Sequence, residues 1–194
     1  MGTTTLHTVD DLLRVPDPDL PHELRRGVMW LVTPATSVHG VVSARVLVAL
    51  GQHVYPHDLG ALFTAEAGFW LERDPDTLLC PDVAFVAKQR LPAVPLEPRF
   101  LELPPDLAVE VLSPSERPAA VRAKIADYLR LGVRAVWVVD PARRTVRIHS
   151  RVGRRTTEAL LAENDTLDGG EVVPGFRCRI AELFADLRRS TPGP

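Results

Sequence analysis

The stretch PPDLAVEVLSPSE, residues 104–116, contains an acidic residue inside an otherwise apolar strand pattern. Residues 107–112 lie between a proline pair and Ser-Pro-Ser, and such a short apolar run is typical of a strand buried on both faces. Glu110 stands in the middle of this run. Because a carboxylate removed from water costs several kcal/mol unless its charge is compensated, the sequence predicts a structural or chemical partner for Glu110.

The residues around this strand predict a mixed α/β fold. A helix is predicted over 116–131, closed by Gly132, and is followed by a second buried strand over 134–140. In such a strand–helix–strand unit the two strands are parallel. Upstream, two strands over 61–71 and 78–86 are predicted to form a hairpin around the turn RDPDT. The series predicts one domain with a central mixed β-sheet flanked by helices.

Weaker patterns predict the remaining elements. We expect a helix over 8–15 with Thr8 and Asp11 as a capping box, an extended segment over 24–32, a helix over 37–55 with an apolar stripe from Val38 to Leu50, a surface loop over 88–105, a strand over 145–149, a strand-like segment over 171–180 and a helix over 181–188. The expected organisation is a single domain, 1–194, with a core at about 8–184 and a flexible tail over 185–194.

Composition excludes several protein classes. The chain has 194 residues, of which 45% are hydrophobic and 25% charged, as in ordinary globular proteins. Its N-terminus has no secretory pattern, and no apolar run approaches the roughly 18 residues of a membrane helix. Two cysteines are too few for a disulfide framework, so we expect a cytoplasmic protein without a membrane partner.

The charges are distributed unevenly along the chain. Residues 116–155 contain eleven lysine or arginine residues and three acids, a net charge of +8, although the whole chain carries −2. A local basic stretch can bind nucleic acid. It can equally be a solvated helix face followed by a polar hairpin, and charge alone does not separate the two interpretations.

Asp82 and Lys124 are candidate partners for Glu110. Asp82 stands at the head of a predicted strand, and two acids at the ends of neighbouring strands can hold one Mg²⁺ ion. Alternatively, Asp82 belongs to a turn and Glu110 pairs with an arginine. Lys124 is one of two lysines against 21 arginines, and its spacing from Val121 and Tyr128 places it on the inward helix face. A lysine there can also be a flanking residue whose charge reaches solvent.

Three motifs in order carry a family resemblance. They are Pro81-Asp82, VEVLSPS at 109–115 and KIADYLRLGVRAVWVVDP at 124–141, and together they resemble the Uma2 family of predicted endonucleases. That family belongs to the PD-(D/E)xK nuclease superfamily, so the resemblance implies a restriction-endonuclease-like fold. HELRRG at 22–27 and the helix containing His39 also resemble the family, which extends the similarity to roughly 8–184.

The resemblance implies a metal-dependent nuclease, with a DNA endonuclease expected. Asp82, Glu110 and the backbone carbonyl of Val111 would bind Mg²⁺ or Mn²⁺, which would activate water for phosphodiester hydrolysis. The superfamily lysine, expected two residues after the glutamate, would stand at Leu112; in Uma2-like sequences its role passes to the next helix and therefore to Lys124.

Further residues are assigned supporting roles. Glu66 becomes an additional metal ligand if the RDPDT turn places it opposite Ala84, and Arg122 and Arg130 are candidate nucleic-acid contacts. Glu23 and His39 match the family pattern, but a structural role is favoured for both: Glu23 pairing with an arginine, and His39 packing near a helix start.

Other interpretations remain open at this point. A protein of the same fold can be catalytically inactive and bind nucleic acid or a partner through the basic stretch, and a carboxylate pair can hydrolyse another class of substrate. Ser113 and Ser115 are interpreted as helix-capping residues, and the three tryptophans, including Trp30, as core or interface residues. A nuclease that cuts two strands is also expected to form a homodimer with two sites.

Overall fold

The computed structural model describes residues 5–14, 22–31, 35–92, 100–114, 116–153, 155–185 and 187. Its centre is a six-stranded mixed sheet in the order β10-β9-β8-β7-β6-β3. The strands are β3 (Gly60–Thr64), β6 (Val83–Ala87), β7 (Leu107–Val111), β8 (Ala135–Asp140), β9 (Thr145–Val152) and β10 (Arg155–Leu161). Only β7 and β8 pair in parallel, as the strand–helix–strand pattern predicted.

Helix α3 (Pro118–Arg130) joins the two parallel strands. It begins two residues later than predicted, and Arg117 occupies the cap without a side-chain capping bond. Glu116 instead accepts a 2.7 Å hydrogen bond from the Ser113 backbone N–H, so it orders the turn before the helix. Because Arg117 is the cap residue of α3, the prediction that Ser113 caps this helix is wrong. Ser115 lies outside the described residues. The helix closes as predicted, with Gly132 at φ +103°.

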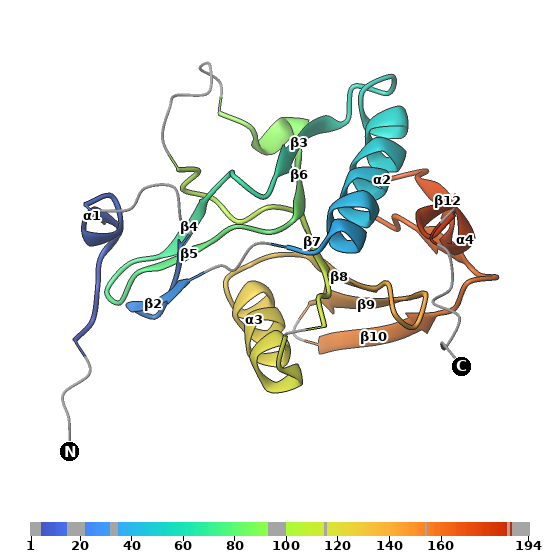
Figure 1. The fold of residues 1–194 in the computed structure, drawn as a ribbon. Helices are drawn as coiled ribbons and strands as arrows, with labels where there is room; N and C mark the ends of the chain where they lie inside the picture. Colours follow the sequence, from blue (N-terminus) through green and yellow to red (C-terminus); the bar gives the residue numbers. More distant parts are fainter. Residues whose placement is uncertain are drawn as a thin grey trace, which may run out of the picture.

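A smaller sheet lies beside the central one, in the order β2-β1-β5-β4 (Figure 1). It contains β1 (His22–Arg25), β2 (Val28–Leu31), β4 (Phe69–Glu72) and β5 (Thr77–Leu79). The extended segment predicted over 24–32 is in fact a hairpin that turns at Arg26 and Gly27, which both have positive φ, +51° and +74°. Because arginine rarely adopts this conformation, the turn had no sequence signal.

The predicted hairpin over 61–86 is divided between the two sheets. Its tip forms β4 and β5, whereas its base forms β3 and β6 in the central sheet. Phe63, and not Glu66, pairs with Ala84, because β3 ends at Thr64 and the chain turns before β4. The register that placed Glu66 opposite Ala84 is therefore wrong.

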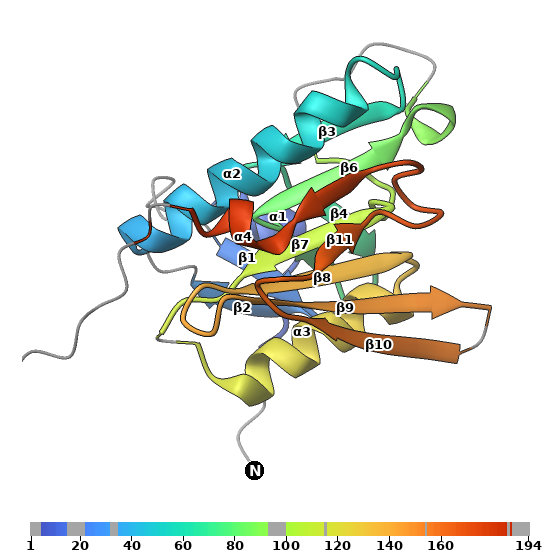
Figure 2. The ribbon, with the colours of Figure 1, turned by 90° about the vertical axis from the view of Figure 1, so that its right-hand side faces the viewer.

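Helices cover both faces of the central sheet (Figures 1 and 2). Helix α2 (Ser37–Val54) and helix α4 (Ile180–Leu183) pack on one face, and α3 packs on the other. The buried stripe of α2 is Val42, Val46, Leu50 and Val54, whereas Val38 and Val41, which were predicted to belong to it, are 43% exposed. Thr36 caps α2 at its start.

The remaining elements are short. They are α1 (Val9–Leu12), which has the predicted Thr8–Asp11 capping box, the 3₁₀ helix η1 (Lys88–Arg90), β11 (Thr166–Asp168) and β12 (Arg177–Arg179). The strand predicted over 171–180 is thus confined to β12, and β10 had no predicted counterpart. Most of the predicted tail lies outside the described residues. None of the described helices combines the length and apolar character that crossing a bilayer requires.

Candidate active site

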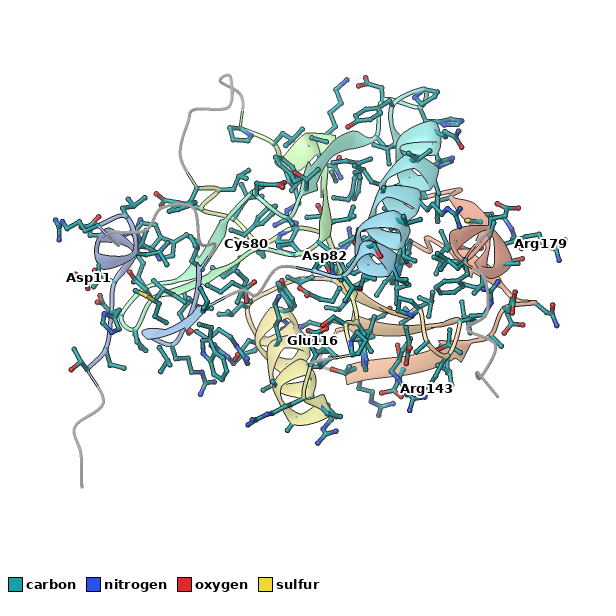
Figure 3. All side chains as sticks on the ribbon, in the orientation of Figure 1. Asp11, Cys80, Asp82, Glu116, Arg143 and Arg179 are labelled. Carbon is teal, nitrogen blue, oxygen red and sulfur yellow. The ribbon has the colours of Figure 1, made fainter. Side chains whose placement is uncertain are left out.

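Asp82 lies where the small sheet leads into the central sheet (Figure 3). It immediately precedes β6, whose first residue pairs with Val109, so Asp82 stands beside the end of β7 that carries Glu110. Its Oδ2 accepts a 2.7 Å hydrogen bond from the Val111 backbone N–H and lies 3.1 Å from Nε2 of His39. The backbone of β7 and a side chain of α2 therefore orient this carboxylate together.

His39 belongs to the first turn of α2, whose capping residue Thr36 accepts a bond from the His39 backbone N–H. The hydrogen bond to Asp82 raises the pKa of His39 and outweighs the opposing effect of burial. Asp82 thus favours a protonated imidazole next to it. His39 is more than the packing residue expected from sequence, because it holds the Asp82 side chain in place.

The Glu110 side chain lies on the face of β7 that α3 covers, and Glu110 is 7% exposed. Its Oε2 accepts a 2.9 Å hydrogen bond from Nζ of Lys124, and its Oε1 accepts a 2.7 Å bond from the hydroxyl of Tyr128. Both donors come from one face of α3, four residues apart. The buried acid therefore has a lysine partner rather than an arginine.

Lys124 binds a second carboxylate. Its Nζ also lies 2.9 Å from Oε1 of Glu23 in β1, which accepts a further hydrogen bond from the Cys80 backbone N–H. The expectation that Glu23 pairs with an arginine is therefore wrong. The lysine side chain is only 18% exposed, so the two ion pairs are largely shielded from water. Lys124 in this way connects α3 with both sheets.

The cluster contains more negative than positive charge. Burial raises the pKa of Glu110 to about 8; Lys124 opposes this shift, and the carboxylates of Asp82 and Glu23 add to it. Burial disfavours the charged form of Lys124, yet its pKa is raised because Glu110 and Glu23 flank it. Burial and the same two acids raise the pKa of Tyr128 well above its usual range. An additional cation would relieve this imbalance.

The donors present fit a hard cation that retains water ligands. Among the described residues, no three histidine, cysteine, aspartate or glutamate side chains converge closely enough to hold an ion without other ligands. Mg²⁺, however, is commonly bound by one or two carboxylates, with backbone oxygens and water completing its shell. Asp82, which directly precedes β6, and Glu110 in the adjacent β7 provide such a pair.

Comparisons with known proteins agree with the family resemblance and with the fold. The family model of Uma2, described as "Putative restriction endonuclease", matches residues 9–181. The chain belongs to the Uma2 family. A crystal structure titled as a putative nuclease belonging to DUF820 from Anabaena variabilis ATCC 29413 is similar, with a TM-score of 0.76 and 20% identity over 91% of this chain and 97% of that one. No curated protein matches the sequence.

Three residues predicted for the Uma2 site lie outside the cluster. Glu66 is exposed, and its carboxylate accepts a hydrogen bond from the Thr64 hydroxyl. Arg130 forms a bidentate pair with Glu72, with both contacts at 2.6–2.7 Å. Arg122, together with Arg130, lines a groove of about 630 Å³ between α3 and the β9–β10 pair.

Sequence reasoning missed two features around the Uma2 site. Tyr128 was placed on the inward helix face but given no role, although its spacing of four residues from Lys124 is a usable signal. Asp127 was not singled out from the sequence, yet it is buried and forms a 2.7 Å ion pair with Arg25 of β1. Pairing between residues 102 positions apart has no local signal.

Proposed function

We propose that this Uma2 protein is a Mg²⁺-dependent nuclease that hydrolyses phosphodiester bonds, with DNA as the substrate and internal bonds as the point of cleavage. The supporting observation is the cluster in which Lys124 contacts Glu110 next to Asp82 at the junction of two sheets. A buried lysine between carboxylates, in a family whose model is described as "Putative restriction endonuclease", fits phosphoryl chemistry better than a purely structural role.

Asp82 and Glu110 would hold the ion, and the carbonyl of Val111 is a further proposed ligand. When bound, Mg²⁺ supplies charge that acidifies a water molecule and neutralises the phosphate. Hydrogen bonds within the protein orient the two carboxylates before an ion binds. His39 and the Val111 backbone N–H hold Asp82, and Tyr128 and Lys124 hold Glu110. Mn²⁺ has similar ligand preferences and is expected to replace Mg²⁺.

Lys124 is proposed to act on the phosphate. An ammonium group has three N–H donors, and Glu110 and Glu23 accept two of them. The third can bind a non-bridging phosphate oxygen or the attacking water, where a positive charge stabilises the transition state. Because both carboxylates raise its pKa, Lys124 keeps its proton and serves as an electrostatic group rather than as a base.

Cleavage assays test the proposal. Plasmid DNA, single-stranded DNA and RNA are incubated with the protein in Mg²⁺, Mn²⁺ or EDTA, and we expect metal-dependent cleavage of DNA that disappears in Asp82→Asn and Glu110→Gln. The control is Glu158→Gln, which removes a half-exposed carboxylate from β10. Cleavage that survives both site substitutions contradicts the assignment. Binding without cleavage in every metal would instead favour a catalytically inactive binding protein.

A further inference from the structure

Trp30 lies on the same sheet face as the candidate site. In the β1–β2 pair Trp30 is directly opposite Glu23, and directly opposed residues project to the same face of an antiparallel pair. The Glu23 side chain on this face reaches Lys124. Trp30 therefore neighbours the lysine's second carboxylate, and β2 runs beside α3 in both ribbon views (Figures 1 and 2).

The indole of Trp30 is unusually open for a residue of its size. It is 47% exposed, whereas Trp137 is buried in the core. β2 is an edge strand of the small sheet, and no other strand of the described residues pairs with its outer side. The guanidinium carbon of Arg25 lies 5.7 Å from the indole centroid, and Asp127 holds this arginine through a 2.7 Å contact. A supported aromatic surface thus borders the site.

The basic stretch offers less charge to a nucleic acid than its composition indicates. Five arginines of residues 116–155 form ion pairs with acids of the protein itself. The pairs are Arg130–Glu72, Arg134–Asp106, Arg143–Asp140, Arg144–Glu163 and Arg147–Glu158. Phosphate contacts normally supply much of the affinity for a duplex. With these arginines already paired, contacts to bases gain importance for binding.

We propose that Trp30 stacks on an unpaired base next to the phosphate that is cleaved, so that the protein acts on single-stranded or locally unpaired nucleic acid. Within a duplex each base is covered on both faces by its neighbours, and an indole can stack only on a base that has left this arrangement. The inference rests on the proposed nuclease function and specifies the substrate of the same site.

Oligonucleotide binding in EDTA, followed by fluorescence anisotropy, separates stacking from chemistry. Removal of a stacking aromatic costs roughly 1–3 kcal/mol per base, so we expect Trp30→Ala to bind single-stranded DNA roughly 5- to 150-fold more weakly. Trp30→Phe keeps an aromatic ring and is expected to stay close to the wild type. The control is Leu31→Ala, which removes a 53% exposed side chain from the opposite face of the same strand.

A base-deletion series identifies the contact directly. Single-stranded oligonucleotides with one abasic position, moved along the chain, are bound to wild type and Trp30→Ala. At the stacked position, removal of the base should weaken binding by the wild type but not by Trp30→Ala, because the contact is already lost. Additive losses at every position overturn the inference.

Three further results have distinct meanings. If the wild type cleaves nucleic acid and Trp30→Ala binds and cleaves equally well, the stacking inference fails while the nuclease function stands. If the wild type neither binds nor cleaves any nucleic acid, both fail. If Trp30→Ala converts a dimer to a monomer in sedimentation experiments and leaves binding unchanged, Trp30 belongs to a contact between two copies and the inference is overturned.

Discussion

Nζ of Lys124 in α3 lies 2.9 Å from Oε2 of Glu110 in β7, so a helix supplies the cation that this strand lacks. The position two residues after Glu110 is Leu112, which directly follows the end of β7 and packs against the apolar cluster beneath α3. The parallel βαβ crossover brings α3 over the face of β7 that carries Glu110. In the proposed site the lysine next to Glu110 therefore comes from α3 and not from β7.

Lys124→Met is expected to abolish cleavage and to lower the free energy of unfolding by about 3–5 kcal/mol, because Glu23 and Glu110 lose their shared partner. Urea unfolding measures the stability. In the triple variant Lys124→Met/Glu23→Gln/Glu110→Gln, stability should largely return while cleavage stays absent. A single variant that is both stable and active would show that Lys124 has neither role.

The stability of the wild type is expected to fall between about pH 4.5 and pH 8. Because the pKa of Glu110 is raised from 4.5 to about 8, the folded protein retains a proton that the unfolded chain releases over this interval. The slope contributed by this group is at most about 1.4 kcal/mol per pH unit. Glu110→Gln removes the titrating group and should flatten the profile in thermal unfolding; parallel profiles for the two proteins would contradict the assignment.

Addition of Mg²⁺ at pH 8 is expected to raise the thermal unfolding midpoint of the wild type, because the ion binds the folded site and neutralises its excess negative charge. At a free Mg²⁺ concentration of 100 times the dissociation constant, binding raises the free energy of unfolding by about 2.7 kcal/mol. Asp82→Asn and Glu110→Gln should lose this response, whereas Glu158→Gln in β10 should keep it. A response that persists in both site variants places the ion elsewhere, and calorimetric titration provides an independent check.

Asp127→Asn is expected to destabilise the protein by about 3 kcal/mol and to leave Mg²⁺ binding intact. Asp127 and Arg25 form a pair in which both side chains are nearly buried, so removal of one charge leaves the other without compensation. Urea unfolding and calorimetric Mg²⁺ titration measure the two effects separately. Loss of Mg²⁺ binding in a folded variant would mean that this pair also positions the site.

Both cysteines are expected to be unreactive in the native protein at pH 8. Burial raises the pKa of Cys80 to about 12 and that of Cys178 to about 11, from an ordinary value of 9.0. Because only the thiolate reacts, this shift alone slows Cys80 about a thousandfold. A chromogenic disulfide reagent should titrate two thiols after unfolding in urea, and Cys80→Ser identifies the slower one. Rapid labelling of native Cys80, which is partly buried, would contradict the raised pKa of its thiol.

The central βαβ unit was predictable because its signals are local. The apolar run around Glu110, the helical spacing of Lys124 and Tyr128, and the closing Gly132 all act over a few residues. From these signals the parallel pair and the mixed sheet follow. Asp82 was a candidate because it stands at the head of a predicted strand, and the resemblance to Uma2 agreed with that choice. Its position beside Glu110, however, depends on pairing between β6 and β7.

Features that depend on distant pairing were not predictable. The predicted position of Glu66 opposite Ala84 was wrong because the chain passes from the central sheet to the small sheet between β3 and β4. The prediction assumed one uninterrupted register for the whole hairpin. The partners of Glu23 and His39 come from α3 and from the start of β6, and no spacing along the chain indicates either contact. The 47% exposure of Trp30 was not predicted either, because the Trp30 side chain projects from the face of an edge strand whose surroundings depend on strand order.

The passage of one hairpin through both sheets has a mechanical consequence. The tip of this hairpin pairs with β1, which carries Glu23, while its base leads into Asp82 beside β7. Lys124 thus joins the two sheets, because it forms ion pairs with Glu23 in the small sheet and with Glu110 in the central sheet. A substitution that moves the two sheets apart would also lengthen these ion pairs, so the proposed catalytic groups are aligned by the same contacts that join the sheets.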